Sequence, residues 1–321
     1  MLDLIGFGAL NVDMVYEVDD LANITVGGRS CEPGAEMFSD ASQFAEVQEL
    51  LKQHGKPRGR SAGGSAANTA VALARMGFRT GYIGRVGADE NGAFLLDSMQ
   101  GVDLSRVKRG GTTGVTMVLL DSAGERTIIV LPNANDEFSA KDIDMDYAAD
   151  TKWLHLTSFA GDTPTKTQIE VVGKLTDKVK ISFDPGEINT QKGLVKMMPV
   201  FNGSRVVFIT DREIRLLTGE DYVDGSREII NYGPEIVVAK LGSMGSYVLT
   251  REEEIREPSM DVVPVDKTGA GDVYAAGFIG GLLQNISLAR CAHVASRAAA
   301  YSITGWGRES YPDATIFQER A

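Results

Sequence analysis

Cysteine and histidine are scarce in this sequence, and their scarcity excludes two classes of protein. Among 321 residues there are two cysteines and three histidines. Cys31 and Cys291 lie far apart and match no disulfide framework, and His54, His155 and His293 form no metal-binding pattern. We therefore expect neither a disulfide scaffold nor a His/Cys metal centre. Two ordinary thiols are typical of a reducing cytoplasm, where we expect the protein to work.

Long apolar runs and an excess of positive charge are also missing. No apolar stretch reaches the roughly 18 residues that a membrane helix needs. The opening segment Met1–Gly6 is typical of a first strand and not of a signal peptide. The net charge is −12 and no basic stripe stands out, so we expect no membrane or nucleic-acid partner. Such an acidic chain has to hold an anionic ligand locally, through backbone amides, a few Lys or Arg residues, or a metal ion.

Two common nucleotide-binding motifs are absent as well. The chain contains no Gly-x-x-x-x-Gly-Lys-Ser/Thr loop, which disfavours a Walker-type kinase. Gly6-x-Gly8 lacks the third glycine of a dinucleotide fingerprint, and its strand is expected to continue into Asn11–Asp13.

What the chain does contain is a regular alternation of strand-like and helix-like segments. Runs rich in β-branched or apolar residues predict strands over Leu2–Ala9, Thr80–Val86, Val115–Leu120, Thr127–Leu131, Trp153–Leu156, Lys180–Asp184, Val206–Ile209, Ile236–Lys240 and Ser246–Thr250. Helical spacing and helix-forming residues predict helices over Phe44–His54, Ser65–Met76, Glu213–Leu217, Asp272–Leu283 and Leu288–Tyr301. This alternation predicts an α/β domain with a mostly parallel sheet, and ligands in such sheets gather at the carboxyl ends of the strands.

Two stretches break the alternation. Asn11–Arg60 is long and mixed, and Thr112–Leu131 is expected to form two strands joined by a turn at Asp121–Glu125. Strands that are not interleaved with helices can form a small separate sheet. We therefore predict a single domain over residues 1–321, with a β-sheet lid formed from about residues 12–40 and 112–131.

The strongest chemical signal is the run Thr268-Gly269-Ala270-Gly271-Asp272 at the expected start of a helix. The glycines let backbone amides approach an anion, and the free N–H groups and positive dipole end of the helix would face the same point. Such an arrangement suits a transferring phosphoryl group. The alternative is that Asp272 is an ordinary helix cap after a glycine-rich turn.

Here the residues carry a resemblance to a known family. Asp266-x-Thr268-Gly-Ala-Gly-Asp272 resembles the C-terminal signature of the ribokinase (PfkB) family of carbohydrate kinases. Gly63-Gly64-Ser-Ala-Ala-Asn68, followed by Ile83–Gly92, resembles the second family signature. The match runs from Gly6 to about Gly307. It implies a three-layer α/β/α fold with a central mostly parallel sheet and a small β lid.

The resemblance also implies roles for individual residues. The amides of Gly269, Ala270 and Gly271 would form an anion hole, and Asp272 would be the general base that activates a sugar hydroxyl. The acceptor would be bound by Asn11, Asp13, Gly63, Gly64 and Asn68. A carboxylate such as Asp13 can accept hydrogen bonds from both hydroxyls of a diol, although Asn11 and Asp13 could instead merely shape a turn.

On the nucleotide side the resemblance is weaker. Glu213 matches a family glutamate that organises Mg²⁺ and its waters, but Thr210 stands where asparagine is usual. The other expected nucleotide contacts are Lys240, Gly242, Ser243, Gly245, Thr268 and Ser296. For these positions a purely structural role remains an equal alternative. Asp266 falls where some relatives bind a monovalent cation, so K⁺ is a further candidate.

The acceptor stays open at this stage. The helix before Gly63 is similar to the nucleoside-kinase branch of the family, whereas Arg126–Val130 looks more like the ribokinase branch. A nucleoside base would need an apolar shelf, for which Met14, Tyr16, Phe38 and Met117 are candidates, or these residues simply pack the lid. Tyr301 and Trp306 are expected to be core or packing residues.

We thus expect an ATP- and Mg²⁺-dependent kinase that acts on a hydroxyl of a sugar. The alternatives are a nucleoside kinase of the adenosine, inosine or cytidine type, an enzyme that uses ADP as donor, and a non-catalytic sugar-binding protein. A homodimer through the lid is a further expectation from the resemblance.

Overall fold

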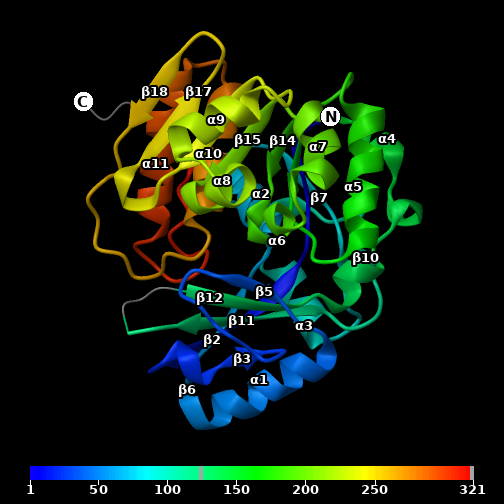
Figure 1. The fold of residues 1–321 in the computed structure, drawn as a ribbon. Helices are drawn as coiled ribbons and strands as arrows, with labels where there is room; N and C mark the ends of the chain where they lie inside the picture. Colours follow the sequence, from blue (N-terminus) through cyan, green and yellow to red (C-terminus); the bar gives the residue numbers. More distant parts are fainter. Residues whose placement is uncertain (123–125, 319–321) are drawn as a thin grey trace.

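The computed structural model describes residues 1–122 and 126–318, and its largest sheet is mostly parallel. Within those residues this sheet has nine strands, in the order β18-β17-β16-β15-β14-β13-β1-β7-β9 (Figure 1). The strands are β1 (Leu2–Phe7), β7 (Thr80–Ile83), β9 (Val102–Asp103), β13 (Thr151–Thr157), β14 (Lys180–Asp184), β15 (Val206–Thr210), β16 (Ile236–Lys240), β17 (Ser246–Leu249) and β18 (Glu254–Glu257). Neighbours from β9 to β16 pair in parallel, and β17 and β18 are antiparallel. The predicted sheet is therefore confirmed.

Helices cover both faces of this sheet, because the side chains of successive strand residues point to opposite faces. On β1, Leu4 belongs to one buried cluster and Ile5 to the other. The first cluster is closed by α2 (Ser65–Arg75), α10 (Ala270–Leu283) and α11 (Leu288–Ser302). The second is closed by α4 (Met145–Ala149), α5 (Asp162–Leu175), α7 (Leu194–Gly203), α8 (Asp211–Thr218) and α9 (Tyr222–Ile230). The result is the expected three-layer α/β/α arrangement.

A second sheet, which we call the lid sheet, lies across one end of the first (Figure 1). Its described strands run in the order β5-β12-β11-β2-β6. They are β2 (Asn11–Val18), β5 (Glu36–Phe38), β6 (Gly55–Ala62), β11 (Gly114–Leu120) and β12 (Arg126–Leu131). Helix α1 (Ala41–His54) packs on its outer face through a third apolar cluster that includes Val47, Leu51 and Met117.

Shorter elements connect these layers. They are β3 (Thr25–Val26), β4 (Arg29–Ser30), β8 (Arg85–Val86), β10 (Lys108–Arg109), α3 (Glu90–Asp97), α6 (Gly186–Gln191), and the 3₁₀ turns at Leu21–Asn23, Asn133–Glu137, Ala140–Asp142, Gly242–Met244 and Ala314–Phe317. None of the described helices combines the length and the apolarity that crossing a membrane requires.

The lid sheet differs from the sequence prediction in two ways and agrees with it in a third. The strand expected to run from Gly6 into Asn11–Asp13 is wrong, because β1 ends at Phe7 and β2 belongs to the other sheet. Strand β6 was not predicted as a lid strand, since Gly55–Ala62 contains no β-branched or aromatic residue and is strand only through its pairing with β2. The β11–β12 hairpin is confirmed, while Ala123–Glu125 of its expected turn lie outside the described residues.

The parallel register determines where polar residues gather. Thr157, Asp184, Thr210 and Lys240 end four neighbouring strands, and the register pairs Thr157 with Asp184 and Thr210 with Lys240. These residues therefore lie at one edge of the sheet, the edge at which open α/β sheets bind ligands.

Candidate active site

The glycine-rich turn at Gly269–Gly271 opens helix α10. Gly269 is the N-cap residue and has a φ of 77°, in the left-handed region that favours glycine. In the first turn of α10 the Ala270 N–H makes a long bond of 3.4 Å to the Lys267 carbonyl, and the Asp272 N–H donates to the Gly269 carbonyl at 3.0 Å. The positive end of the helix dipole lies at this turn. A Cβ at Gly269 would lie 3.0 Å from the Tyr311 hydroxyl and 3.1 Å from Asn68 Nδ2. The turn thus combines the positive end of a helix dipole with a backbone that has little room for side chains.

Asp272 lies in the first turn of α10, and a chain of hydrogen bonds fixes its carboxylate. Asn68 Nδ2, on α2, donates to Asp272 Oδ2 at 2.8 Å. Arg308 Nε donates to Asn68 Oδ1 at 3.0 Å. Since a guanidinium can only donate, Asn68 has to present its oxygen to Arg308 and its amino group to Asp272. This Arg308–Asn68–Asp272 chain therefore orients one oxygen of the carboxylate.

The surroundings of Asp272 tune its proton affinity. Burial raises the pKa of Asp272 to about 7; the Asn68 hydrogen bond and the Lys240 ammonium oppose this rise, and the Asp184 carboxylate adds to it. A general base works best when its pKa lies near the operating pH, because it is then both available and able to accept a proton. Asp272 has that property near neutrality.

The residues predicted to bind the acceptor gather around Asp13 on β2. A Cβ at Gly63 would lie only 2.4 Å from an Asp13 carboxylate oxygen, and one at Gly64, where φ is 104°, would lie 2.5 Å from the Ala9 carbonyl. Both positions therefore require glycine. Asn11 Oδ1 accepts a hydrogen bond from Asn135 Nδ2 at 2.9 Å.

Asp13 is itself buried, and its protonation is perturbed. Burial raises the pKa of Asp13 to about 7, against the opposing charges of Arg308 and Arg126. Asp272 and Asp266 are near enough to act on it electrostatically. The structure thus brings Asp13, from the lid, toward Asp272, from the main domain.

Lys240 adds a positive charge beside the glycine-rich turn. Its Nζ forms a buried ion pair with Asp184, and a Cβ at Gly271 would lie 3.3 Å from that Nζ. Burial works to lower the pKa of Lys240, but the Asp184 and Glu213 carboxylates raise it overall. The ammonium therefore stays charged next to the first-turn amides of α10.

Thr210 and Glu213 form a reciprocal cap at the start of α8. The Thr210 hydroxyl accepts from the Glu213 N–H at 3.3 Å, and Glu213 Oε2 accepts from the Thr210 N–H at 2.8 Å. Burial raises the pKa of Glu213 to about 7. These bonds give both residues a structural role, and their contact with a nucleotide stays a prediction.

The next nucleotide candidates lie in the loop after β16 and on helix α11. Gly242 and Ser243 are exposed in a 3₁₀ turn, and a Cβ at Gly245 would lie 2.0 Å from the Glu257 carbonyl. Ser296 Oγ, on α11, donates to the Pro258 carbonyl at 2.9 Å, so it holds the loop after β18.

Asp266 links two loops near the glycine-rich turn. Its carboxylate accepts from the Thr268 N–H at 2.9 Å and from the Gly307 N–H at 3.1 Å. Both bonds are structural, and they place Thr268 and the 306–308 loop beside each other.

A directly coordinated metal centre is not preformed. In residues 1–122 and 126–318, no group of three or more His, Cys, Asp or Glu side chains is placed to hold a metal ion. Four carboxylates are nevertheless close enough to interact electrostatically: Glu36, Asp184, Glu187 and Glu213. Burial raises the pKa of Glu36 to about 7, and the negative charges of the other three carboxylates add to this rise. Carboxylates in this arrangement fit Mg²⁺ held largely by water and phosphate oxygens.

The sequence reasoning missed Arg308, Asn135 and Glu36. Arg308 lies in a loop after α11 where no motif marks it, and its role depends on the packing of that loop against α2. The packing role expected for Trp306 is wrong, because its side chain is 51% exposed and lines a pocket together with Arg308.

Comparison with known proteins gives consistent matches. The model of the pfkB family of carbohydrate kinases matches residues 38–313. A protein named as an uncharacterized sugar kinase of Archaeoglobus fulgidus is 34% identical over 75% of this chain and 98% of its own length. A protein named ATP-dependent ribose-1-phosphate kinase, from Halopiger xanaduensis, is 32% identical over 79% of this chain and 84% of its own length.

Solved structures match the fold over nearly the whole chain. An adenosine kinase from Sinorhizobium meliloti has a TM-score of 0.86 at 24% identity and covers 97% of both chains. The Arabidopsis thaliana ribokinase complexed with ribose and ATP has a TM-score of 0.78 at 22% identity and covers 99% of both chains. These likenesses confirm the predicted three-layer fold with its additional small sheets.

Proposed function

Because this chain belongs to the pfkB family of carbohydrate kinases, and is therefore a kinase, we propose that it transfers the γ-phosphoryl group of ATP to a hydroxyl of a sugar, with Asp272 as general base. The single observation that carries this proposal is the oriented, buried Asp272 carboxylate in the glycine-rich first turn of α10. ATP is preferred over ADP as the donor, because the Halopiger relative is named as ATP-dependent.

In the proposed reaction, Asp272 accepts the proton of the acceptor hydroxyl as its oxygen attacks the γ-phosphorus. The bond from that phosphorus to the bridging oxygen of the β-phosphate breaks, and ADP leaves. Positioning and charge stabilisation supply most of the catalysis in phosphoryl transfer. Asn11, Asp13, Gly63, Gly64 and Asn68 would hold the acceptor for this attack.

The amides of Gly269, Ala270 and Gly271 would hold the charge on the transferring group. The Lys240 ammonium beside Gly271 would add a point charge there. Such preorganised donors stabilise the transition state without reorganisation.

Mg²⁺ would neutralise charge on the ATP phosphates when it is bound. Glu213 and Asp184 would orient its water ligands, in agreement with the lack of a direct three-ligand cluster in the described residues. Thr210, Gly242, Ser243, Gly245, Thr268 and Ser296 would line the nucleotide site. A monovalent ion near Asp266 would have to share a carboxylate that already accepts two backbone N–H groups.

A sugar is favoured over a nucleoside by the packing of the lid sheet. A nucleoside base would need an apolar shelf, but Met117 is fully buried in the apolar cluster under α1, and Met14 and Tyr16 pack against that cluster. Of the four shelf candidates only Phe38 is exposed, at 50%. The lid would close over the sugar and exclude water. Pairing of two lids in a homodimer is a further expectation, which light scattering would test.

Replacement of Asp272 by asparagine tests the general base. Asp272→Asn keeps the size of the side chain and an oxygen that can accept from Asn68, but it cannot take a proton. Turnover should fall by about 10²- to 10⁴-fold while acceptor binding persists. An assay of ADP release over pentoses, hexoses, sugar acids and nucleosides, with ATP and ADP compared as donors, supplies the acceptor and the rates.

Asp221→Asn is the matched control. Asp221 is the exposed N-cap of α9, and asparagine caps a helix as well as aspartate does. The control should keep full turnover. Full turnover in Asp272→Asn would remove Asp272 from the base role, and acceptor binding without turnover in the unmodified protein would favour a non-catalytic binder.

A further inference from the structure

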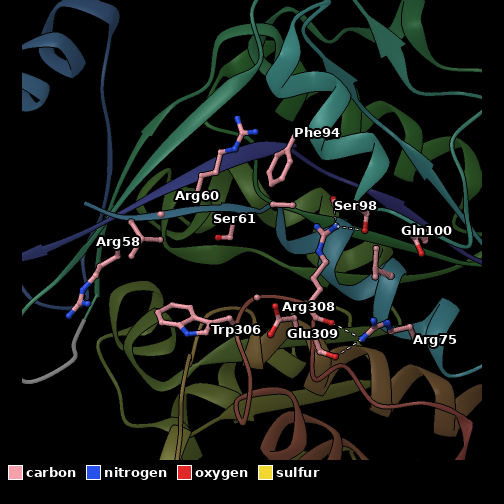
Figure 2. A pocket seen from close by; sticks show the side chains of 15 residues that line it. Arg58, Arg60, Ser61, Arg75, Phe94, Ser98, Gln100, Trp306, Arg308 and Glu309 are labelled. Atoms are coloured by element: carbon pink, nitrogen blue, oxygen red, sulfur yellow. Dashed lines mark hydrogen bonds between the residues drawn. The ribbon is translucent and has the colours of Figure 1, made fainter. Parts of the chain in front are cut away.

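A pocket lined by arginines lies between the lid sheet and the main domain (Figure 2). It has a volume of about 700 Å³, within the range of small-molecule sites. Its walls come from strand β6 of the lid sheet, from α2 and α3, and from the 306–309 loop. Four arginines, Arg58, Arg60, Arg75 and Arg308, line it against one carboxylate, Glu309. Such a concentration of positive charge stands out in a chain with a net charge of −12.

Arg308 is the central residue of this pocket. Figure 2 shows its side chain rising from the 306–309 loop toward Ser98. Its Nη1 donates to Ser98 Oγ at 2.9 Å, and its Nε donates to Asn68. Its Nη2 is buried and has no hydrogen-bond partner in the described part of the chain. No carboxylate among residues 1–122 and 126–318 forms an ion pair with Arg308, so a buried guanidinium is left with an unused donor.

Arg60 supplies a second guanidinium on the opposite wall. It lies 4.5 Å over the Phe94 ring and has one long bond, of 3.5 Å, to Asn91 Oδ1. Within the described ranges it has no carboxylate partner either. Arg58, in contrast, is paired with Glu17, and Arg75 donates to the backbone carbonyls of the 308–311 segment. In the described part of the chain Arg60, Arg75 and Arg308 have no carboxylate partner, and of these Arg308 has a buried donor without a partner and Arg60 has a single long hydrogen bond.

Two residues, Asn68 and Ala62, connect the pocket with the proposed active site around Asp272. Asn68 connects Arg308 to Asp272. Ala62 lines the pocket and precedes Gly63, which touches the Asp13 carboxylate. A ligand that extends from the pocket past Ala62 and Arg308 would approach Asp13 and Asp272, which lie beyond the pocket lining.

We propose that the acceptor is a phosphorylated sugar, whose phosphate monoester is bound in this pocket by Arg308 and Arg60 while its reacting hydroxyl lies at Asp272. The inference rests on the function proposed above. A phosphate monoester carries nearly two negative charges at neutral pH and three acceptor oxygens, which match two unpaired guanidiniums better than a singly charged carboxylate does. The existing phosphate is not altered, and the product is a bisphosphate together with ADP.

The first experiment compares acceptors. ADP release is measured with free pentoses and hexoses, their monophosphates and the matching sugar acids. The expected result is a kcat/KM at least about 10²-fold higher for one monophosphate than for its free sugar, as expected for a charge-assisted pair of contacts. Equal rates for the free sugar would overturn the proposal. A preference for the sugar acid would overturn the phosphate assignment.

The second experiment replaces Arg60, which makes no contact with Asp272 or Asn68. Arg60→Met keeps an apolar stem over Phe94, and it should raise KM for the monophosphate by about 10- to 100-fold while KM for ATP stays the same. Arg60→Lys should recover part of the loss. Arg205→Met is the matched control, since Arg205 pairs with Glu235 at the amino-terminal edge of the main sheet. An unchanged KM for the monophosphate in Arg60→Met would contradict the assignment.

A direct binding measurement separates this inference from the proposed function. Trp306 lines the pocket and is half exposed, whereas the other tryptophan, Trp153, is buried. Titration with inorganic phosphate should change the fluorescence of Trp306, and binding should weaken in Arg60→Met and persist in Asp272→Asn. If no acceptor is turned over but phosphate binds in this way, the kinase proposal fails and the pocket assignment stands. If phosphate leaves the fluorescence unchanged and does not compete with the acceptor, the pocket assignment fails.

Discussion

Replacement of Asn68 tests how the site controls the pKa of Asp272, the proposed general base. Its Nδ2 donates to Asp272 Oδ2 at 2.8 Å, and this bond lowers the pKa of Asp272 against the opposing effect of burial. In Asn68→Ala the carboxylate stays buried but loses this donor. The pKa of Asp272 should therefore rise above its present value of about 7.

The size of the shift follows from the strength of the lost bond. A hydrogen bond to a charged group contributes about 1.5–3 kcal/mol, and one pKa unit corresponds to about 1.4 kcal/mol. The acidic limb of kcat/KM should therefore move upward by about 1–2 pH units. At about pH 7 the fraction of ionised Asp272 would fall roughly 5- to 50-fold, and activity should recover as the pH is raised above about 9.

The assay is a profile of kcat/KM against pH, measured by ADP release. Asn68→Asp is a useful second variant, because it keeps an acceptor for Arg308 but replaces the donor to Asp272 by a like charge, so its limb should also move upward. Asn231→Ala, which removes an exposed amide at the end of α9, should leave the profile unchanged. An equal loss at every pH, with the limb still near 7, would show that Asn68 only binds the acceptor and would refute the reasoning.

Two further predictions concern buried charge. Asp272→Asn should be more heat-stable than the unmodified protein at about pH 8, and this difference should disappear as the pH falls to about 4. The folded-state pKa of Asp272 is raised to about 7, so the native form loses stability as the pH rises from about 4 to 7, and the variant escapes that loss. A lower Tm for the variant at about pH 8 would contradict this. Lys240→Met leaves the Asp184 and Glu213 carboxylates without their buried cation and should cost about 3–5 kcal/mol in urea unfolding at about pH 8. The cost should shrink as the pH falls through about 7 and Glu213 takes up a proton, and an identical cost at both pH values would count against the coupling.

The main sheet and the start of α10 could be predicted from the sequence, because both depend on local sequence features. Each predicted strand is an apolar or β-branched run, and its length and composition favour a strand wherever it is buried. The glycine-rich turn before Asp272 is also local, since its conformation depends on Gly269 itself. The sequence pattern therefore brought together the glycine-rich turn and Asp272, which we propose as anion-binding turn and base.

Part of the lid sheet could not be predicted from local sequence features. Strand β6 has the sequence Gly-Lys-Pro-Arg-Gly-Arg-Ser-Ala and no strand propensity of its own. It is a strand because β2 offers it an edge with unpaired backbone groups. The same pairing places Arg60 on the wall of the pocket, so a segment that looked like a basic loop became part of a candidate binding site.

By itself the sequence determined the fold class, the family and the glycine-rich turn at the start of α10, because these depend on short motifs and on periodicity. Only the tertiary structure decided what surrounds them. Arg308 follows Asn68 by 240 residues, and the bond between them exists because the 306–309 loop lies against α2. The unused donor of Arg308, and hence the pocket to which we assign a phosphate, results from this long-range packing, which no local pattern encodes.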